Sequence, residues 1–227
     1  LINIPIHLQG NRSMRIAELL HITVKKSLPK IHKTRFKALI DVITSLMNHG
    51  HLTLTSLGRH MLGSSGVKHK IKKVDRLLNN KHLQSEKFSI YKALAKSIFS
   101  SVRKAVILVD WTGCCSNERY ILQASLLGKG RSIPIYKELY PVNLQSNSKV
   151  QNEFLKKLKK IIPEHVQEII IVADAGFKTP WFRAVLEIGW HFVGRLRRDP
   201  YFKMEGNEQW NKAKDFHHIC SNQPRYI

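Results

Sequence analysis

Apolar residues recur with helical spacing through the first half of the chain. Over residues 35–47 they fall at positions i, i+3, i+4 and i+7, which predicts a helix packed on a core. A short helix is predicted over 53–62, a turn over the Gly- and Ser-rich stretch 63–66, and a second helix over 67–78. A further helix is predicted over 85–100. The first half is therefore expected to be all-helical.

At residue 105 the pattern changes to short apolar runs separated by polar turns. Strands are predicted over 105–110, 120–127, 132–138, 169–173 and 190–196, and helices over 150–162 and 179–188. Pro134 places the third strand at a sheet edge, because proline cannot donate to a central ladder. Three antiparallel strands, a crossover helix, a parallel strand, a helix and a last strand follow the order of a ribonuclease-H-like mixed sheet. In that order the first and fourth strands are neighbours.

Two of these strands end in a carboxylate. The run 105–109 leads into Asp110, and the run 169–173 leads into Asp174. Runs this short and apolar are typical of strands buried on both faces, and we expect Asp110 to lie where its strand leaves the sheet. If the strands are parallel neighbours, the two ends lie about 5 Å apart. The alternative is that each aspartate caps the turn after its own strand.

Two carboxylates this close repel each other unless a cation lies between them. Carboxylate oxygens are hard ligands, and they suit Mg²⁺ or Mn²⁺. We therefore predict that Asp110 and Asp174 are both catalytic residues and metal ligands. Sites of this kind normally need a third acid.

The charge of the chain is strongly positive. It carries 38 Lys and Arg against 16 Asp and Glu, a formal net charge of +22 over 227 residues. This balance indicates a polyanionic partner, with nucleic acid far ahead of a membrane. Residues 14–104 hold 19 basic against 4 acidic residues, whereas 105–227 hold 18 against 12. The first half is therefore expected to bind the polyanion, and the second half to carry the chemistry.

Basic residues are concentrated on the helix predicted over 67–78. This helix follows a short helix and a Gly-rich turn, which is the order of elements in a helix-turn-helix. Contacts from the basic helix would hold double-stranded DNA by its phosphates. The alternative is a solvated lysine-rich face. The predicted DNA-binding residues are Lys68, Lys70, Lys72, Lys73 and Arg76.

The cysteines and the apolar runs bear on the cellular compartment. Cys114, Cys115 and Cys220 form no CxxC pair, which favours a reducing compartment over a disulfide or zinc scaffold. The longest apolar runs have five or six residues, far short of a bilayer span. No secretory signal is recognisable, and no membrane partner is expected.

Several motifs together resemble a known family. They are LTLTSLGR at 52–59, KKVDRLL at 72–78, ILVDW at 107–111 and VADAGFKTPW at 172–181, with Gly189, Trp190 and the stretch 206–210. On these motifs the chain resembles the DDE transposases of the bacterial insertion-sequence-four family from about residue 14 onward. The resemblance implies cut-and-paste DNA transposition, with metal-dependent cleavage and strand transfer at transposon ends, in the bacterial cytoplasm on the nucleoid. It also implies that Asp110 and Asp174 are the first two acids of the triad.

One part of the family pattern is absent. The third acid is a glutamate in a Tyr-x₂-Arg-x₃-Glu-x₆-Lys motif after a β-rich insertion, and the chain shows no such motif. The expectation is thus a truncated transposase or a fragment of one. The alternative is a catalytically dead protein that acts only by binding DNA; self-association on DNA is left open.

The expected domains follow from these observations. Residues 1–13 are expected to be a non-native or disordered extension, and 14–104 a helical DNA-binding domain. Residues 105–196 are expected to form the first part of a ribonuclease-H-like core, and 197–227 the start of the insertion.

Overall fold

The structure is a computed structural model. It describes residues 18–19, 21–22, 25–26, 28, 31–49, 51–114, 118–195, 201–203 and 206–219. The extension expected at 1–13 lies outside the described residues. The chain divides into two compact units: residues 1–101 with 161–163, and residues 102–160 with 164–227. The fold is mixed α/β, with helices and a five-stranded mixed sheet.

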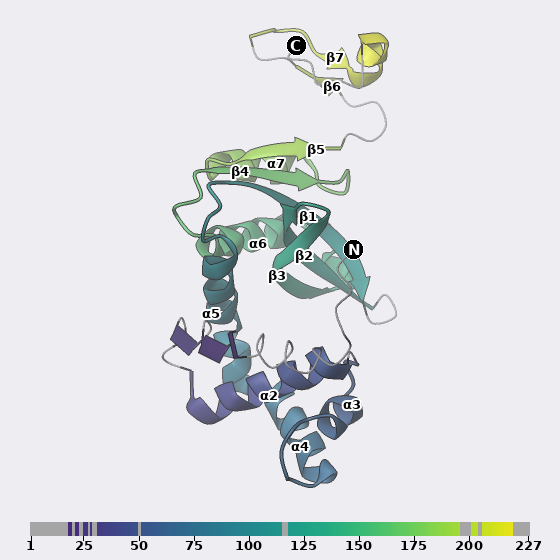
Figure 1. Cartoon of the computed structure of the whole chain (residues 1–227). Helices are drawn as coiled ribbons and strands as arrows, with labels where there is room; N and C mark the ends of the chain where they lie inside the picture. The colour runs from purple at the N-terminus through teal and green to yellow at the C-terminus, as the bar shows by residue number, and fades with distance from the viewer. Residues whose placement is uncertain are drawn as a thin grey trace, which may run out of the picture. The chain divides into compact units, whose positions relative to one another are not determined.

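The first unit contains the four helices that the apolar pattern predicted (Figure 1). They are α2 (Lys33–His49), α3 (Leu54–Arg59), α4 (Val67–Leu78) and α5 (Lys81–Ile98). Caps define two of the starts: Thr53 accepts a hydrogen bond from the Ser56 amide at 3.2 Å, and Asn80 accepts one from the Leu83 amide at 3.1 Å. Gly63, with φ of +108°, takes the left-handed conformation in the turn between α3 and α4.

Helices α2, α3 and α4 pack around one apolar cluster. Its buried members are Leu57, Met61 and Val74. The buried Ser45 hydroxyl donates to the Leu57 carbonyl at 2.8 Å and so joins α2 to α3. Helices α3 and α4 cross closely at Gly58, where an added Cβ would lie within 3 Å of α4. The short α3 is therefore held by packing, because six residues are too few for a stable isolated helix.

The second unit is built on the five-stranded sheet, whose order is β3-β2-β1-β4-β5. The strands are β1 (Lys104–Cys114), β2 (Arg119–Gly128), β3 (Arg131–Pro141), β4 (Glu168–Ala173) and β5 (His191–Gly194). The hairpins β1-β2 and β2-β3 are antiparallel, whereas β4 pairs in parallel with both β1 and β5. The predicted adjacency of the first and fourth strands is confirmed. Pro134 does lie in the edge strand β3, beside an irregularity in its register with β2.

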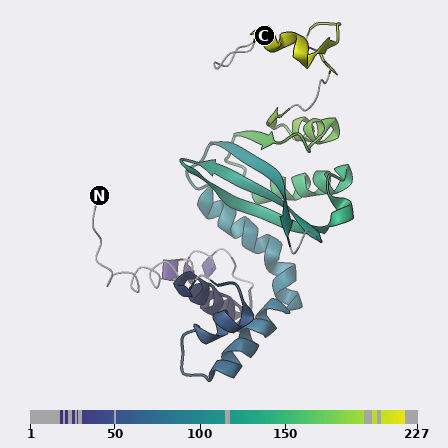
Figure 2. The same cartoon turned by 90° about the vertical axis from the view of Figure 1, so that its right-hand side faces the viewer.

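Two helices cover one face of this sheet. They are α6 (Ser148–Ile161) and α7 (Thr179–Glu187), and Figure 2 shows both on the same side of the strands. Tyr136 of β3 stacks on Phe154 of α6 with ring centroids 5.0 Å apart, and Phe192 of β5 meets Phe182 of α7 in a tilted arrangement with centroids 4.4 Å apart. Right-handed crossovers from β3 to β4 and from β4 to β5 run in one direction across the sheet, so both helices fall on one face.

The prediction that β1 and β4 are buried on both faces was wrong. In each strand fully buried residues alternate with half-buried ones, so only the helix-covered face is sealed. Exposed apolar side chains lie on the other face, where Leu127, Leu139 and Val193 are 50%, 48% and 58% exposed. The apolar runs did not reveal this, because a half-buried position can also carry Val or Leu.

The remaining described elements are small. A 3₁₀ turn, η2 (Val142–Leu144), precedes α6. Near the end of the chain β6 (Tyr201–Phe202) pairs antiparallel with β7 (Asn211–Lys212), followed by the 3₁₀ segment η3 (Ala213–Ile219). Among the described residues, no helix combines the length and the apolarity that a membrane crossing requires.

Candidate functional site

Asp110 and Asp174 are brought to the same level of the sheet by the pairing of β1 and β4. The parallel register runs from Lys104 opposite Glu168 to Val109 opposite Ala173. Each aspartate is the next residue after that last pair. Neighbouring strands lie about 4.8 Å apart, so the two backbones are adjacent where the carboxylates begin. Successive side chains of a strand point to opposite faces of the sheet. Val109 and Ala173 are buried under the helices, so Asp110 and Asp174 lie on the face opposite α6 and α7.

The strand that carries Asp110 does not end there, contrary to the prediction. Strand β1 continues to Cys114, and Asp110 pairs with Gln123 of β2. Only the pairing with β4 stops before Asp110. The exposed Asp110 carboxylate accepts a hydrogen bond from the Trp111 amide at 2.8 Å. The antiparallel hairpin thus continues as a rigid support beyond the parallel part of the sheet.

Asp174 is held by the turn that follows β4. Its Oδ1 accepts a hydrogen bond from the Gly176 amide at 2.8 Å, and its carbonyl accepts one from the Phe177 amide at 3.2 Å. A Cβ added at Gly176 would lie 2.9 Å from Asp174 Oδ1. The carboxylate therefore does cap its turn, as the alternative interpretation supposed, and Gly176 leaves room for it. Capping fixes the carboxylate and does not prevent it from binding a cation.

A basic residue lies at the same level on one side of the carboxylate pair. Gln123 of β2 is opposite Asp110, and Lys137 of β3 is opposite Gln123. The Lys137 side chain is exposed, and Gln123 donates to the Ser125 hydroxyl at 3.0 Å. Lys137 thus stands two strands from Asp110 on the same face, about 10 Å away by strand spacing.

A second basic residue lies on the other side. Gly194 of β5 pairs with Ala173, and the Arg195 amide donates to the Ala173 carbonyl at 3.2 Å. Arg195 therefore reaches the level of Asp174, and it is exposed. The row across the sheet is Lys137, Gln123, Asp110, Asp174 and Arg195. Sequence reasoning missed Lys137 and Arg195, because only the registers of β3 with β2, β2 with β1 and β4 with β5 bring them to the level of the carboxylates. The alternation of side chains along β3 and β5 was the available signal.

The two carboxylates fit a hard divalent cation only in part. Their oxygens are the donors that Mg²⁺ and Mn²⁺ prefer. Within the described ranges, however, no cluster of three or more His, Cys, Asp and Glu side chains could hold a metal ion. Asp110 and Asp174 can supply two protein ligands, and other oxygens would have to complete the coordination.

Trp111 packs on the covered side of the sheet. Its ring meets Tyr140 edge-on at 5.6 Å. The Tyr140 hydroxyl donates to the Glu138 carboxylate, which also accepts from the Lys157 ammonium at 2.9 and 3.1 Å. Burial raises the pKa of the Glu138 carboxyl, but hydrogen bonds from Tyr140, Tyr136 and Lys157 outweigh it and hold the pKa below its usual range. This network joins β3 to α6 on the covered face, whereas Asp110 lies on the opposite face.

The basic residues of α4 divide into two groups. Lys68, Lys72 and Arg76 are exposed and follow one another at i, i+4 and i+8, so they form a continuous ridge on the helix. Hereafter these three residues are called the α4 ridge. Lys70 is half-buried, on the side of the helix that carries the buried Val74.

Lys73 is half-buried as well, and its ammonium bonds the Asp41 carboxylate of α2 at 2.5 Å. Its charge is therefore shared within the unit, and it ties α4 to α2. Of the five residues predicted to bind DNA, the structure brings three together on an exposed surface and places Lys70 and Lys73 elsewhere.

Comparison with known protein families finds no match for this chain, and comparison with curated proteins finds no similar sequence. The family resemblance accordingly rests on the sequence motifs given above.

Proposed function

We propose that this chain is part of a DDE transposase of the bacterial insertion-sequence-four family. In this proposal the second unit is the first part of a ribonuclease-H-like catalytic domain, and the first unit binds the DNA of the transposon ends. The observation that carries it is the parallel register of β1 and β4, after which both strands continue directly into an aspartate. The strand order β3-β2-β1-β4-β5 supports the same fold.

The proposed reaction is metal-dependent cleavage and transfer of DNA strands. A bound Mg²⁺ or Mn²⁺ would activate a water or a 3′-hydroxyl and would stabilise the leaving oxygen. Asp110 and Asp174 would hold the metal, and each carboxylate accepts a hydrogen bond from a backbone amide that orients it. The exposed Lys137 and Arg195 flank them and attract the phosphodiester backbone to this face of the sheet.

The first unit is proposed to bind double-stranded DNA through the α4 ridge. Exposed lysine and arginine side chains bind phosphates and release counterions, which gives affinity without reading sequence. The net charge of +22 adds long-range attraction. Such a protein would act on the nucleoid in the bacterial cytoplasm, and assembly of copies on the two transposon ends belongs to the same proposal.

The second candidate function is DNA binding without catalysis. The described residues bring two carboxylates together, whereas the family reaction uses three acids. A chain with the α4 ridge and an incomplete acid set would occupy transposon ends without cutting them. The two functions share the DNA contact and differ in metal chemistry.

Manganese binding tests the catalytic proposal directly. We would titrate Mn²⁺ into the whole chain and follow the free ion by electron paramagnetic resonance, for the wild type, Asp110→Asn and Asp174→Asn. Glu187→Gln is the matched control, because it removes one exposed negative charge at the end of α7. Each Asn variant is expected to lose about ten-fold or more in affinity, since losing one of two carboxylate ligands costs more than about 1.4 kcal/mol; the control should bind like the wild type.

Nicking of supercoiled plasmid by the same proteins then separates the two functions. Metal-dependent nicking that disappears in both Asn variants supports the transposase. DNA binding and Mn²⁺ binding without nicking favour the second candidate. If Mn²⁺ binds equally to the wild type and to both Asn variants, the two carboxylates do not hold the metal and the catalytic proposal is refuted.

A further inference from the structure

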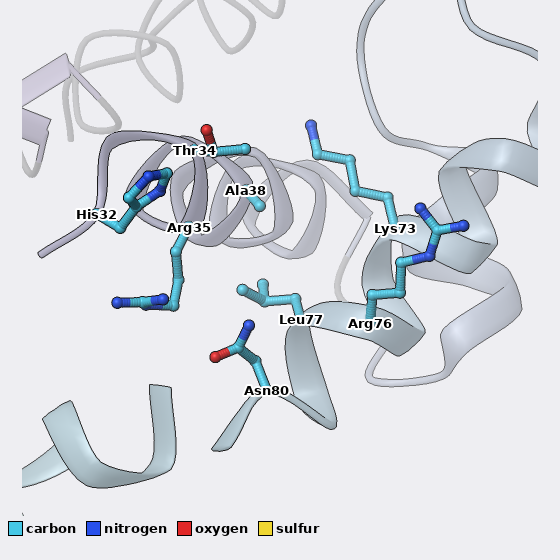
Figure 3. A pocket seen from close by; sticks show the side chains of 8 residues that line it. All are labelled: His32, Thr34, Arg35, Ala38, Lys73, Arg76, Leu77 and Asn80. Carbon is cyan, nitrogen blue, oxygen red and sulfur yellow. The ribbon is translucent and has the colours of Figure 1, made fainter. Parts of the chain in front are cut away.

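A pocket of about 400 Å³ lies in the first unit between the start of α2 and the end of α4 (Figure 3). Its apolar part is formed by Ala38 and Leu77, both buried. The other lining residues are polar or cationic: His32, Thr34, Arg35, Lys73, Arg76 and Asn80. Pockets of this size hold groups as large as a small ligand, which leaves room for one phosphate with its sugar.

The lining favours an anion over a cation. None of the lining side chains is a carboxylate. The Asn80 Oδ1 accepts the hydrogen bond of the Leu83 amide at 3.1 Å, and this cap fixes which way the amide group points. In Figure 3 the amide nitrogen of Asn80 is directed toward the space beneath α2, beside Leu77. The cap of α5 thus presents a fixed N–H donor to the pocket.

Two of the cationic lining residues already have partners. Arg35 donates to both carboxylate oxygens of Glu86, at 2.8 and 2.5 Å, and Lys73 bonds Asp41 at 2.5 Å. Arg76 is exposed, and in the part of the chain that the structure describes no carboxylate forms an ion pair with it. Arg76 is therefore the lining residue that offers an uncompensated charge.

We propose that this pocket binds the DNA backbone: the Asn80 amide donates to one phosphate inside it, and Arg76, whose guanidinium points away from Asn80 in Figure 3, donates to a phosphate at its rim. Arg76 is also the last residue of the α4 ridge, so a strand that follows Lys68 and Lys72 arrives at the pocket. The guanidinium fork suits a phosphate, because two parallel N–H groups can bond two of its oxygens. The inference rests on the proposed DNA binding by the first unit, and it adds a defined anchoring point to it.

Asn80→Asp is the sharpest variant. It keeps the oxygen that caps α5 and replaces the pocket-facing donor with a negatively charged acceptor. Gln84→Glu is the matched control, since it makes the same amide-to-carboxylate change one turn along α5 at an exposed position outside the pocket. Binding of a short DNA duplex to the whole chain is measured by fluorescence anisotropy over a range of salt concentrations, together with the thermal melt of each protein.

The expected result is a loss of DNA affinity of about ten-fold or more for Asn80→Asp, as for a lost hydrogen bond to a charged group. Gln84→Glu should change affinity by about two-fold or less, because its exposed charge is screened. Arg76→Ala should lower the slope of log affinity against log salt by about one unit. Equal affinities for Asn80→Asp and Gln84→Glu, with unchanged melts, would overturn the proposal.

Two further measurements identify the source of a failure. Lys68→Ala with Lys72→Ala tests the ridge alone: if this pair weakens binding and Asn80→Asp does not, DNA binding by the first unit stands and the pocket inference fails. If neither changes affinity, the proposed DNA binding by this unit fails with it. A titration with inorganic phosphate, followed by the Asn80 side-chain amide in NMR, gives the last outcome. Saturation by free phosphate with DNA affinity insensitive to Asn80→Asp would mean that the pocket takes a free anion and not DNA.

Discussion

Replacing Gly58 with alanine tests the crossing of α3 and α4, on which the position of the α4 ridge depends. A Cβ at Gly58 would lie 2.4 Å from Ile71 Cγ1 and 2.7 Å from both the Ile71 Cα and its amide nitrogen. Carbon atoms pack favourably at about 3.5–4.0 Å, so α4 would have to move by about 1 Å. A side-chain rotation cannot relieve the contact, because two of the three atoms belong to the backbone.

The expected loss follows from two opposing effects. Forcing an extra methyl into a packed contact costs about 1–3 kcal/mol, and rigid backbone neighbours place this case in the upper half of that range. Alanine returns about 1 kcal/mol through its higher helix propensity. The first unit should therefore lose about 1–2 kcal/mol. In a unit of this size that lowers its melting temperature by about 5–15 °C.

The chain offers an internal control for this measurement. All four tryptophans, at positions 111, 181, 190 and 210, lie in the second unit, so their fluorescence follows that unit alone. Hydrogen exchange of peptides from 54–78 follows the first unit alone. Helical circular dichroism follows mainly the first unit, because α2 to α5 are longer in total than α6 and α7 of the second unit. Gly66→Ala is the matched variant, because a Cβ there meets only His69 Cδ2, at an ordinary 3.8 Å.

Gly58→Ala should shift the helical melt and accelerate exchange, with the tryptophan transition and Gly66→Ala unaffected. Adding Ile71→Ala should restore only part of the loss, because the Ile71 backbone atoms remain in place. A Gly58→Ala protein as stable as the wild type, or full restoration by Ile71→Ala, would refute the close crossing of α3 and α4.

Three further changes separate roles within the molecule. Lys72→Ala should lower the salt slope of DNA binding by about one unit with little effect on stability, whereas Lys73→Ala should lower the melting temperature and leave the slope unchanged; equal slopes for the two variants would contradict this division. Gly176→Ala should displace the Asp174 carboxylate and weaken Mn²⁺ binding in the titration, and unaltered binding would show that the turn does not position it. The pKa of Glu138 is lower in the folded protein than in the unfolded chain. The ionised Glu138 therefore stabilises the folded protein fully above the unfolded pKa of about 4.3, and this contribution is lost as pH falls through the folded-state pKa. Urea unfolding should show Glu138→Gln less stable than the wild type near neutral pH, with a difference that narrows below about pH 4; a constant difference would argue against this linkage.

The sequence alone predicted much of the local structure. Helical spacing and the flanking glycine predicted α4 with the bounds Val67–Leu78 that the structure has. The position of Pro134 in the edge strand also follows from local backbone chemistry. The two apolar runs that lead into Asp110 and Asp174 were likewise visible, and so was the adjacency of their strands. These features depend on residues within one or two turns of each other, or on a chain order with few allowed topologies.

Only the tertiary structure decided the remainder. Strand β1 runs past Asp110 because β2 pairs with it as far as Cys114, and that pairing partner is not encoded in the run itself. The basic residues of α4 look alike in sequence, yet Lys73 is neutralised by Asp41, which lies 32 residues away. Strand registers, which no local pattern contains, bring Lys137 and Arg195 to the level of the carboxylates. Side-chain type and spacing determine which face of its own element a residue occupies, whereas its neighbours depend on contacts between segments far apart in the chain.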